Sequence, residues 1–270
     1  MILAQILKFK SNEDAIHAFD QLKELAQRDN IKYDSRPFIV HVTQGSPLVV
    51  LKNLKDLEID LSFKVRVQPG LNDTLKEDFG DIYKIDIDVP VTLDSLDGTF
   101  NGKVRRSVYL TYFKKPPLES FGIILTGHGW DAVRYALQAL EKHDEGRYFK
   151  QIHKIRINAS KAIEYLSDLG DISGIFIVDI PDSFIKRARV FGTRLHESEV
   201  IRDWTSYRGG TIRSIIFKDK QQRIYFLNEE AAIYSPNSSA EGIGNIAYFI
   251  GVVRDVFSTL VNNGLVRWWL

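Results

Sequence analysis

Apolar and polar residues alternate along much of the first 113 residues, a pattern that predicts β-strands. In residues 57–67 an apolar residue occupies every second position and a charged or polar residue lies between, as in a strand with one buried face. Residues 85–93 repeat this alternation. Shorter strands are predicted at 2–9, 37–43, 47–51 and 103–113.

One helix interrupts these strands. Ser11 or Asn12 can cap its N-terminus, two acids follow in the first turn, and apolar residues then recur at helical spacing. Residues 1–115 are therefore expected to form a domain with a mainly antiparallel sheet and one helix. The sequence Lys-Lys-Pro-Pro at 114–117 marks the boundary of this domain, because two prolines cannot continue a central strand.

Strand-like and helix-like stretches alternate after this boundary. Strands are expected at 121–126, 150–157 and 173–180, with helices at 130–142 and 159–169. This βαβαβ order favours a local parallel sheet. A basic helical stretch is expected to start at Asp182 or Ser183. We then expect a hairpin of residues 211–218 and 223–227, followed by an apolar helix at 244–261. The predicted fold class is therefore α+β, with residues 118–270 as an α/β domain.

Composition narrows the choice of protein class. The chain has 36 basic and 35 acidic residues, so net charge indicates neither a polyanionic nor a membrane partner. It has no cysteine, which excludes disulfides and Cys-ligated metals. The first residues become charged too soon for a signal peptide, and the uncharged apolar stretch at 242–253 is too short to cross a membrane. A cytoplasmic protein is expected.

Charge is nevertheless segregated along the chain. Residues 150–223 hold 14 basic and 9 acidic residues, and within them basic and aromatic residues are interleaved, which suits phosphate contact combined with base stacking. The candidate nucleic-acid-binding residues are Lys186, Arg187, Arg189, Arg194, Arg202, Trp204, Tyr207, Arg208 and Arg213. The alternative is a solvated basic helix whose charges pair with Glu197, Glu199 and Asp203.

A second candidate is the loop Thr-Gly-His-Gly-Trp-Asp at 126–131, which follows a predicted strand and opens a helix. Gly127, His128 and Gly129 could bring backbone N–H groups to a phosphate. Asn158, after the next strand, stands where a dinucleotide-binding fold places an acid. A nucleotide-binding protein, which could be an enzyme, is therefore the rival hypothesis. The alternative for the loop itself is an ordinary tight turn.

No catalytic or metal signature is present. Asp86 and Asp88 share one face of a strand and could bind Mg²⁺, but we interpret that face as the solvated side of an amphipathic strand. The six His residues lack metal-ligand spacing, and no phosphate-binding, zinc-protease or hydrolase motif occurs. We therefore expect a non-enzymatic protein without metal or cofactor.

Trp268 and Trp269 follow the apolar C-terminal helix. They could anchor a protein partner or a second copy together with this helix, or pack on their own core. The sequence as a whole favours a non-enzymatic nucleic-acid-binding or scaffolding accessory subunit. The chain length and the lack of catalytic motifs suit an accessory chain of a nucleic-acid-guided defence complex, such as the separate N-terminal chain of a split Argonaute, although no motif carries that resemblance. A structural interaction protein without a ligand is the third option.

Overall fold

The computed structural model describes residues 1–27, 63–95, 98–182, 184–236 and 243–269. Within these residues the strands form one ten-stranded sheet and one two-stranded sheet, and every pairing is antiparallel. In order across the large sheet, the strands are β2 (Phe63–Val67), β3 (Tyr83–Ser95), β4 (Gly98–Tyr112), β5 (Phe121–Thr126), β1 (Ile2–Lys8), β11 (Ala232–Ser235), β10 (Ile224–Asn228), β9 (Thr211–Lys218), β7 (Asp171–Val178) and β8 (Arg187–Phe191). The small sheet pairs β6 (Lys154–Ile157) with β12 (Val266–Trp269).

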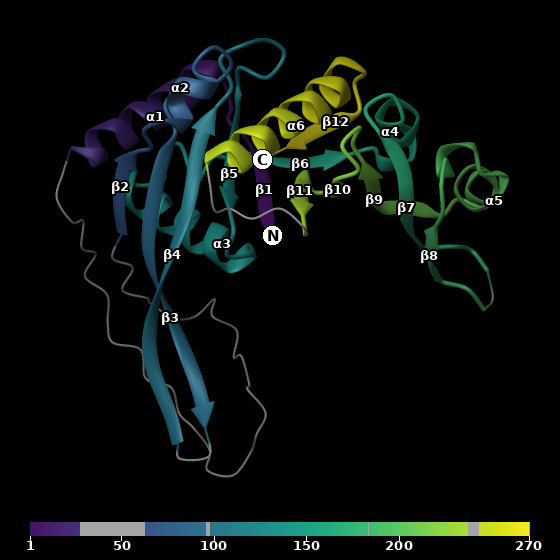
Figure 1. The fold of residues 1–270 in the computed structure, drawn as a ribbon, viewed down its shortest axis with the longest axis horizontal. Helices are drawn as coiled ribbons and strands as arrows, with labels where there is room; N and C mark the ends of the chain where they lie inside the picture. The colour runs from purple at the N-terminus through teal and green to yellow at the C-terminus, as the bar shows by residue number, and fades with distance from the viewer. Residues whose placement is uncertain (28–62, 96–97, 183, 237–242, 270) are drawn as a thin grey trace.

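Helices cover the two faces of the large sheet unequally (Figure 1). Helices α1 (Asn12–Ala26) and α3 (Trp130–His143) pack on one face, where their apolar side chains join a core with residues of β1 to β5. On the other face lie α2 (Leu71–Leu75), α4 (Ala159–Leu166) and α6 (Ile243–Asn262), together with the small sheet. A short 3-10 helix (Leu195–Glu197), α5 (Glu199–Arg202) and a π-helical turn (Asp203–Tyr207) follow β8.

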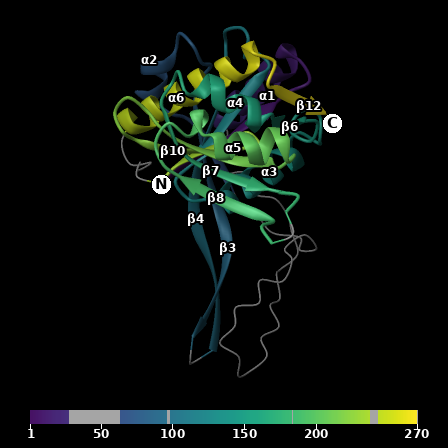
Figure 2. The same cartoon turned by 90° about the vertical axis from the view of Figure 1, so that its right-hand side faces the viewer.

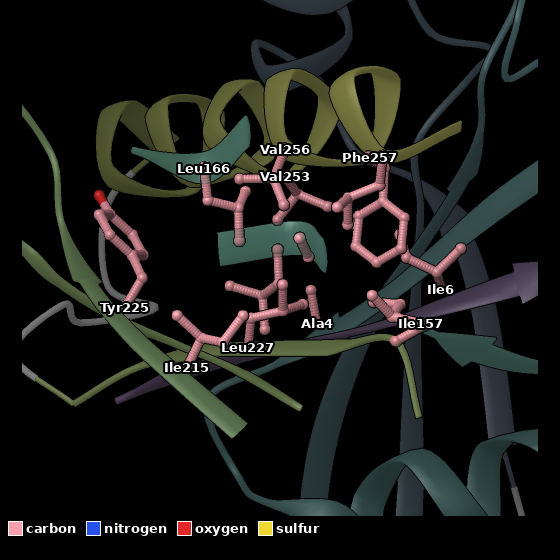
Figure 3. Close-up of a cluster of buried hydrophobic side chains, with 14 of the residues drawn as sticks. Ala4, Ile6, Ile157, Leu166, Ile215, Tyr225, Leu227, Val253, Val256 and Phe257 are labelled. Carbon is pink, nitrogen blue, oxygen red and sulfur yellow. The ribbon is translucent and has the colours of Figure 1, made fainter. Parts of the chain in front are cut away.

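The larger core lies between α6 and the sheet. Val253, Val256 and Phe257 of α6 point toward Ile215 and Leu227 on the strands below (Figure 3). All five side chains are at most 1% exposed. Apolar residues at spacings of three and four give α6 one continuous apolar face, and burying that face fixes the helix on the sheet.

The predicted order of elements from β5 to β7 is confirmed, but the expected parallel sheet is wrong. Strand β5 pairs with β4 and β1, β6 pairs with β12, and β7 pairs with β8 and β9, all antiparallel. Helices α3 and α4 therefore do not return the chain to a parallel neighbouring strand. Hydrophobic periodicity identifies the type of an element, whereas the choice of neighbour depends on tertiary packing.

The helix expected directly after residue 182 is wrong for residues 187–191, whereas helical turns do follow at residues 195–207. Asp182 accepts hydrogen bonds from the N–H groups of Phe184 (2.8 Å) and Ile185 (3.1 Å), as an N-cap would. The chain then continues as strand β8, which pairs with β7. The sequence Arg-Ala-Arg-Val-Phe at 187–191 alternates with a period of two, which suits a strand at the edge of the sheet.

The predicted domain boundary lies in the connection between β4 and β5, which are neighbours in the same sheet. The sheet is continuous across this point, and β1 from the first half pairs with β11 from the second. The hairpin of β9 and β10 and the terminal helix are confirmed. The strands expected at 37–43 and 47–51, and residues 57–62 of the long strand, lie outside the described residues.

Candidate functional site

Half of one sheet face has no helix over it. Helices α1 and α3 contact strands between β2 and β5 on this side, and their core includes Leu3 of β1. Helices α4 and α6 lie on the opposite side. Within the described residues no helix therefore covers β11, β10, β9, β7 and β8 on the α3 side, as Figures 1 and 2 show. We call this area the open face.

One row of residues crosses the open face at right angles to the strands. The strand register places five residues directly opposite one another, one from each strand: Tyr234, Phe226, Ile216, Gly174 and Phe191. Position 174 of this row is a glycine because a Cβ atom there would lie only 2.7 Å from Cδ1 of Ile216. The Ile216 side chain therefore extends across the position of Gly174.

The row is largely aromatic. The rings of Phe226 and Tyr234 stack with centroids 4.4 Å apart and an interplanar angle of 9°. Phe191, at the other end of the row, is 69% exposed. The solvated face of an antiparallel sheet normally carries polar residues at such positions. Exposed aromatic and apolar residues in this row are therefore typical of a binding surface.

A second row lies beside the first and brings positive charge to the rings. It runs through Asn228, Ser214, Phe176 and Arg189, and the Arg189 guanidinium lies 5.4 Å from the centroid of the Phe176 ring. Burial raises the pKa of the Tyr234 hydroxyl, and the charge of Arg189 acts in the opposite direction. Arg189 therefore brings positive charge to the Phe176 ring, in the row beside the first.

Arg187 precedes Arg189 by two residues and points to the same side of β8. Both side chains are exposed, and neither forms a salt bridge with any residue that the structure describes. Neither row contains an acidic residue. Of the nine residues predicted to bind nucleic acid, Arg187 and Arg189 are the two that the fold places on the open face.

Three other predicted arginines are engaged with acids. Arg194 donates to Glu197 through Nε (3.1 Å) and Nη2 (2.5 Å), as the solvated-face alternative expected. Arg208 likewise pairs with Asp203 at 2.8 Å and contacts Asp182 at 3.4 Å. Arg213 is bonded to Glu229 and also faces Asp179. Because these three guanidinium groups are already paired with carboxylates, they attract a phosphate less strongly.

The remaining members of the predicted set lie elsewhere. Lys186 is exposed, and its ammonium donates to the carbonyl of Asp182 at 2.6 Å. Trp204 packs against the α6-side core, while Arg202 and Tyr207 are exposed on the segment that follows β8. This segment lies on the α6 side of the sheet through its buried residues. The single basic surface predicted from the sequence is thus divided between two faces.

Sequence reasoning did not select Phe176, Ile216, Phe226 or Tyr234. These residues come from four strands, and only the register brings them together. One local signal was available: the strand Ile-Tyr-Phe-Leu-Asn at 224–228 is apolar on both faces. A strand with two apolar faces predicts burial or binding on each side.

The glycine loop forms a turn into α3. Gly129 is the N-cap residue with φ 83°, a conformation that favours glycine, and no side chain caps the helix. The His128 N–H donates to Oγ1 of Thr126 at 3.1 Å, and its Nδ1 lies 3.3 Å from Nη1 of Arg106. Burial, followed by the charges of Arg106 and Lys84, lowers the pKa of His128. His128 is therefore predominantly neutral at physiological pH.

The other residues of the nucleotide hypothesis do not gather at this loop. The next strand, β6, belongs to the small sheet and is not a neighbour of β5. Asn158 caps α4 by accepting from the Lys161 N–H at 3.3 Å. The adjacent parallel strands on which a dinucleotide site depends are therefore not formed between Gly127 and Asn158.

Asp86 and Asp88 lie among cations on the face of β3 opposite the α3 side. Asp86 is bonded to Arg66 and accepts from Oγ of Ser107 at 2.6 Å, and Asp88 pairs with Arg105 at 2.9 Å. In the described part of the chain, no three His, Asp or Glu side chains are arranged to hold a metal ion.

Trp268, on β12 of the small sheet, contacts residues of the large sheet. Its ring meets Phe121 edge to face with centroids 5.8 Å apart, and the Lys8 ammonium lies 5.1 Å from its centroid. It is still 44% exposed, and Trp269 is 45% exposed. By length and composition residues 244–262 could cross a membrane, but the apolar face of α6 is buried against the sheet, as in the core helix of a soluble protein.

No protein-family model matches the chain, and a search of curated proteins finds no significant match.

Proposed function

We propose that this chain is a cytoplasmic, non-enzymatic nucleic-acid-binding subunit and that the open face is its binding surface. One observation carries the proposal: a largely aromatic row and a second row that contains Phe176 and Arg189, both without acids, lie with Arg187 on a sheet surface that no described helix covers. Rings provide stacking surfaces for bases, and unpaired guanidinium groups attract phosphates.

The charge of the two arginines favours this interpretation over a surface without a ligand. An arginine at the solvent surface commonly pairs with a nearby acid, as Arg194 and Arg208 do in the same region. Arg187 and Arg189 stand instead on the last strand of the sheet, with the Phe176 ring and Phe191 beside them. Phosphate groups would supply the missing negative charge.

Salt dependence tests the proposal. Binding of fluorescent DNA and RNA about 20 nucleotides long, single- and double-stranded, would be followed by anisotropy at three salt concentrations. Each phosphate contact contributes a slope of about −0.7 to −0.9 to log affinity against log salt. The double variant Arg187→Ala/Arg189→Ala should therefore flatten the slope by nearly two contacts.

The matched control is Arg194→Ala/Arg208→Ala, which removes the same charge from arginines that are paired with acids. It should change the slope by less than one contact. The proposal is wrong if the unmodified protein binds none of the four ligands more tightly than about 10 μM at low salt, a value within the ordinary non-specific range. Equal effects of the two double variants would also contradict it.

A further inference from the structure

Resting on the proposed function, we infer that the open face binds a single strand of nucleic acid over about four nucleotides, with bases on the rings of the two rows and the phosphates at one end of the bound strand over β8. A duplex hides the faces of its bases within its own stack, so rings on a protein surface can stack only on unpaired bases. The rings of Phe226, Tyr234, Phe176 and Phe191 on one face therefore point to a single strand.

The size of the site follows from its borders. The first row crosses five strands, and strands lie about 4.8 Å apart, so the row is roughly 19 Å long. At one end the row continues into Leu3, which is buried under the helices of the α3 side. At the other end β8 is the last strand of the described sheet. This length fits about four nucleotides, the lower end of single-strand site sizes.

The face is suited to stacking more than to reading base edges. The backbone groups of its inner strands are used in the sheet ladders, and the Asn228 side chain already accepts from the Ala232 N–H at 2.8 Å. Ser214 and the Tyr234 hydroxyl are the other neutral polar groups in the two rows. With few free donors or acceptors between the rings, the bound strand should be held with little sequence preference.

Arg187 and Arg189 fix where the backbone lies. Both project from β8 at one end of the rows, whereas the stacked pair of Phe226 and Tyr234 lies at the other end. A strand laid along the rows can place bases on the rings while its sugar–phosphate chain passes the guanidinium groups. Ring and arginine substitutions should consequently have different signatures.

The experiment measures affinity for oligo(dT) and oligo(U) of 2, 3, 4, 6, 8 and 12 nucleotides, and for a 12-base-pair duplex. Affinity should rise steeply with length up to about four nucleotides. Beyond that length it should rise only slightly, because a longer oligonucleotide merely offers more positions at which the same site can bind. The duplex should bind at least tenfold more weakly than the 12-nucleotide single strand.

Two ring variants test the stacking. Phe226→Leu keeps an apolar side chain but removes the ring, and Phe191→Ala truncates a side chain that is 69% exposed. Each should weaken binding roughly 5- to 150-fold and leave the salt slope unchanged. The matched control is Phe184→Ala, because Phe184 is 94% exposed and lies outside both rows. Thermal melting checks that each variant is folded.

The outcomes separate this inference from the proposed function. Absence of binding to every oligonucleotide and to the duplex would refute both. Equal affinity for duplex and single strand, or arginine effects without ring effects, would overturn the single-strand inference while nucleic-acid binding stands. A steep rise in affinity that continues through 12 nucleotides would refute the four-nucleotide footprint.

Discussion

The carboxylate of Asp219 joins the β9–β10 hairpin to α6, and its removal should measurably destabilise the protein. Oδ1 accepts from the N–H groups of Gln221 (2.8 Å) and Arg223 (2.9 Å) within the turn. Oδ2 accepts from the hydroxyls of Tyr225 (3.1 Å) and Tyr248 (2.7 Å), the latter on α6. The hairpin that this carboxylate holds also carries Phe226 of the open face.

The cost of Asp219→Ala can be worked out group by group. Tyr225 is fully buried, so its hydroxyl would lose its acceptor without access to water, at about 1–3 kcal/mol. The turn N–H groups and the Tyr248 hydroxyl are closer to solvent and can bond to water, so together they add about 1–2 kcal/mol. The expected loss is therefore about 2–5 kcal/mol, or roughly 5–15 °C in Tm for a chain of this size.

Urea unfolding of four proteins tests this reasoning: the unmodified chain, Asp219→Ala, Tyr225→Phe and the double variant. Tyr225→Phe removes the hydroxyl that Asp219→Ala would leave unsatisfied, so the double variant should be at least 1 kcal/mol more stable than additivity predicts. Asp131→Ala is the control, since its exposed carboxylate forms a surface pair with Arg134 and should contribute less than about 1 kcal/mol. Strict additivity, or a loss below about 0.5 kcal/mol for Asp219→Ala, would refute the argument.

The same carboxylate should make stability depend on acid pH. Burial alone would raise the pKa of Asp219, but the hydrogen bonds from Tyr248, Arg223, Tyr225 and Gln221 together hold this pKa below its ordinary value. As pH falls, the unfolded chain therefore takes up the proton first. The stabilisation is complete well above the unfolded pKa of about 3.9 and is lost as pH falls toward the folded pKa. The Tm difference between the unmodified protein and Asp219→Asn should thus shrink between pH 6 and pH 3.

Two further predictions concern packing. Gly170→Ala should destabilise the fold by more than about 2 kcal/mol, because a Cβ there would lie 2.0 Å from the Lys218 carbonyl oxygen. Gly251→Ala in α6 should stabilise the fold by about 0.5–1 kcal/mol, because apart from the adjoining backbone of α6 no atom of the described residues lies within 4 Å of the new methyl group. Phe257→Ala should cost about 3–5 kcal/mol, because its fully buried ring lies in the α6-side core (Figure 3). Midpoints of urea unfolding measure all three changes, and a Gly251 variant less stable than the unmodified chain would contradict the first prediction.

Local patterns were sufficient for most individual elements. Ser11 caps α1 by accepting from the Asp14 N–H at 3.0 Å, as the sequence predicted. Strand β5 occupies the predicted residues 121–126, and α6 differs from its prediction by one residue at each end. Capping residues and hydrophobic periodicity depend on a few neighbours along the chain, so the sequence can be read for them directly.

Residues 187–191 were predicted to be helical because the many basic residues in this region obscured their two-residue alternation, which is typical of a strand. Arg187, Arg189 and Phe191 alternate with smaller, less exposed residues, and the edge of an existing sheet stabilises this short segment as a strand. Local sequence gives only weak support to a five-residue strand. Pairing with β7 therefore decided its conformation, and with it the face on which its arginines lie.

The amino-acid sequence by itself determined most of the longer elements of this protein: whether each is a helix or a strand, and which of its sides is apolar. The tertiary structure alone decided how these sides are used. Antiparallel register brought Phe226, Tyr234 and Phe176 from three strands into neighbouring rows, and the packing of α3 and α6 left one face of that half of the sheet without a described helix. Both are contacts between residues far apart in sequence, and no local pattern encodes which distant partner a segment will meet.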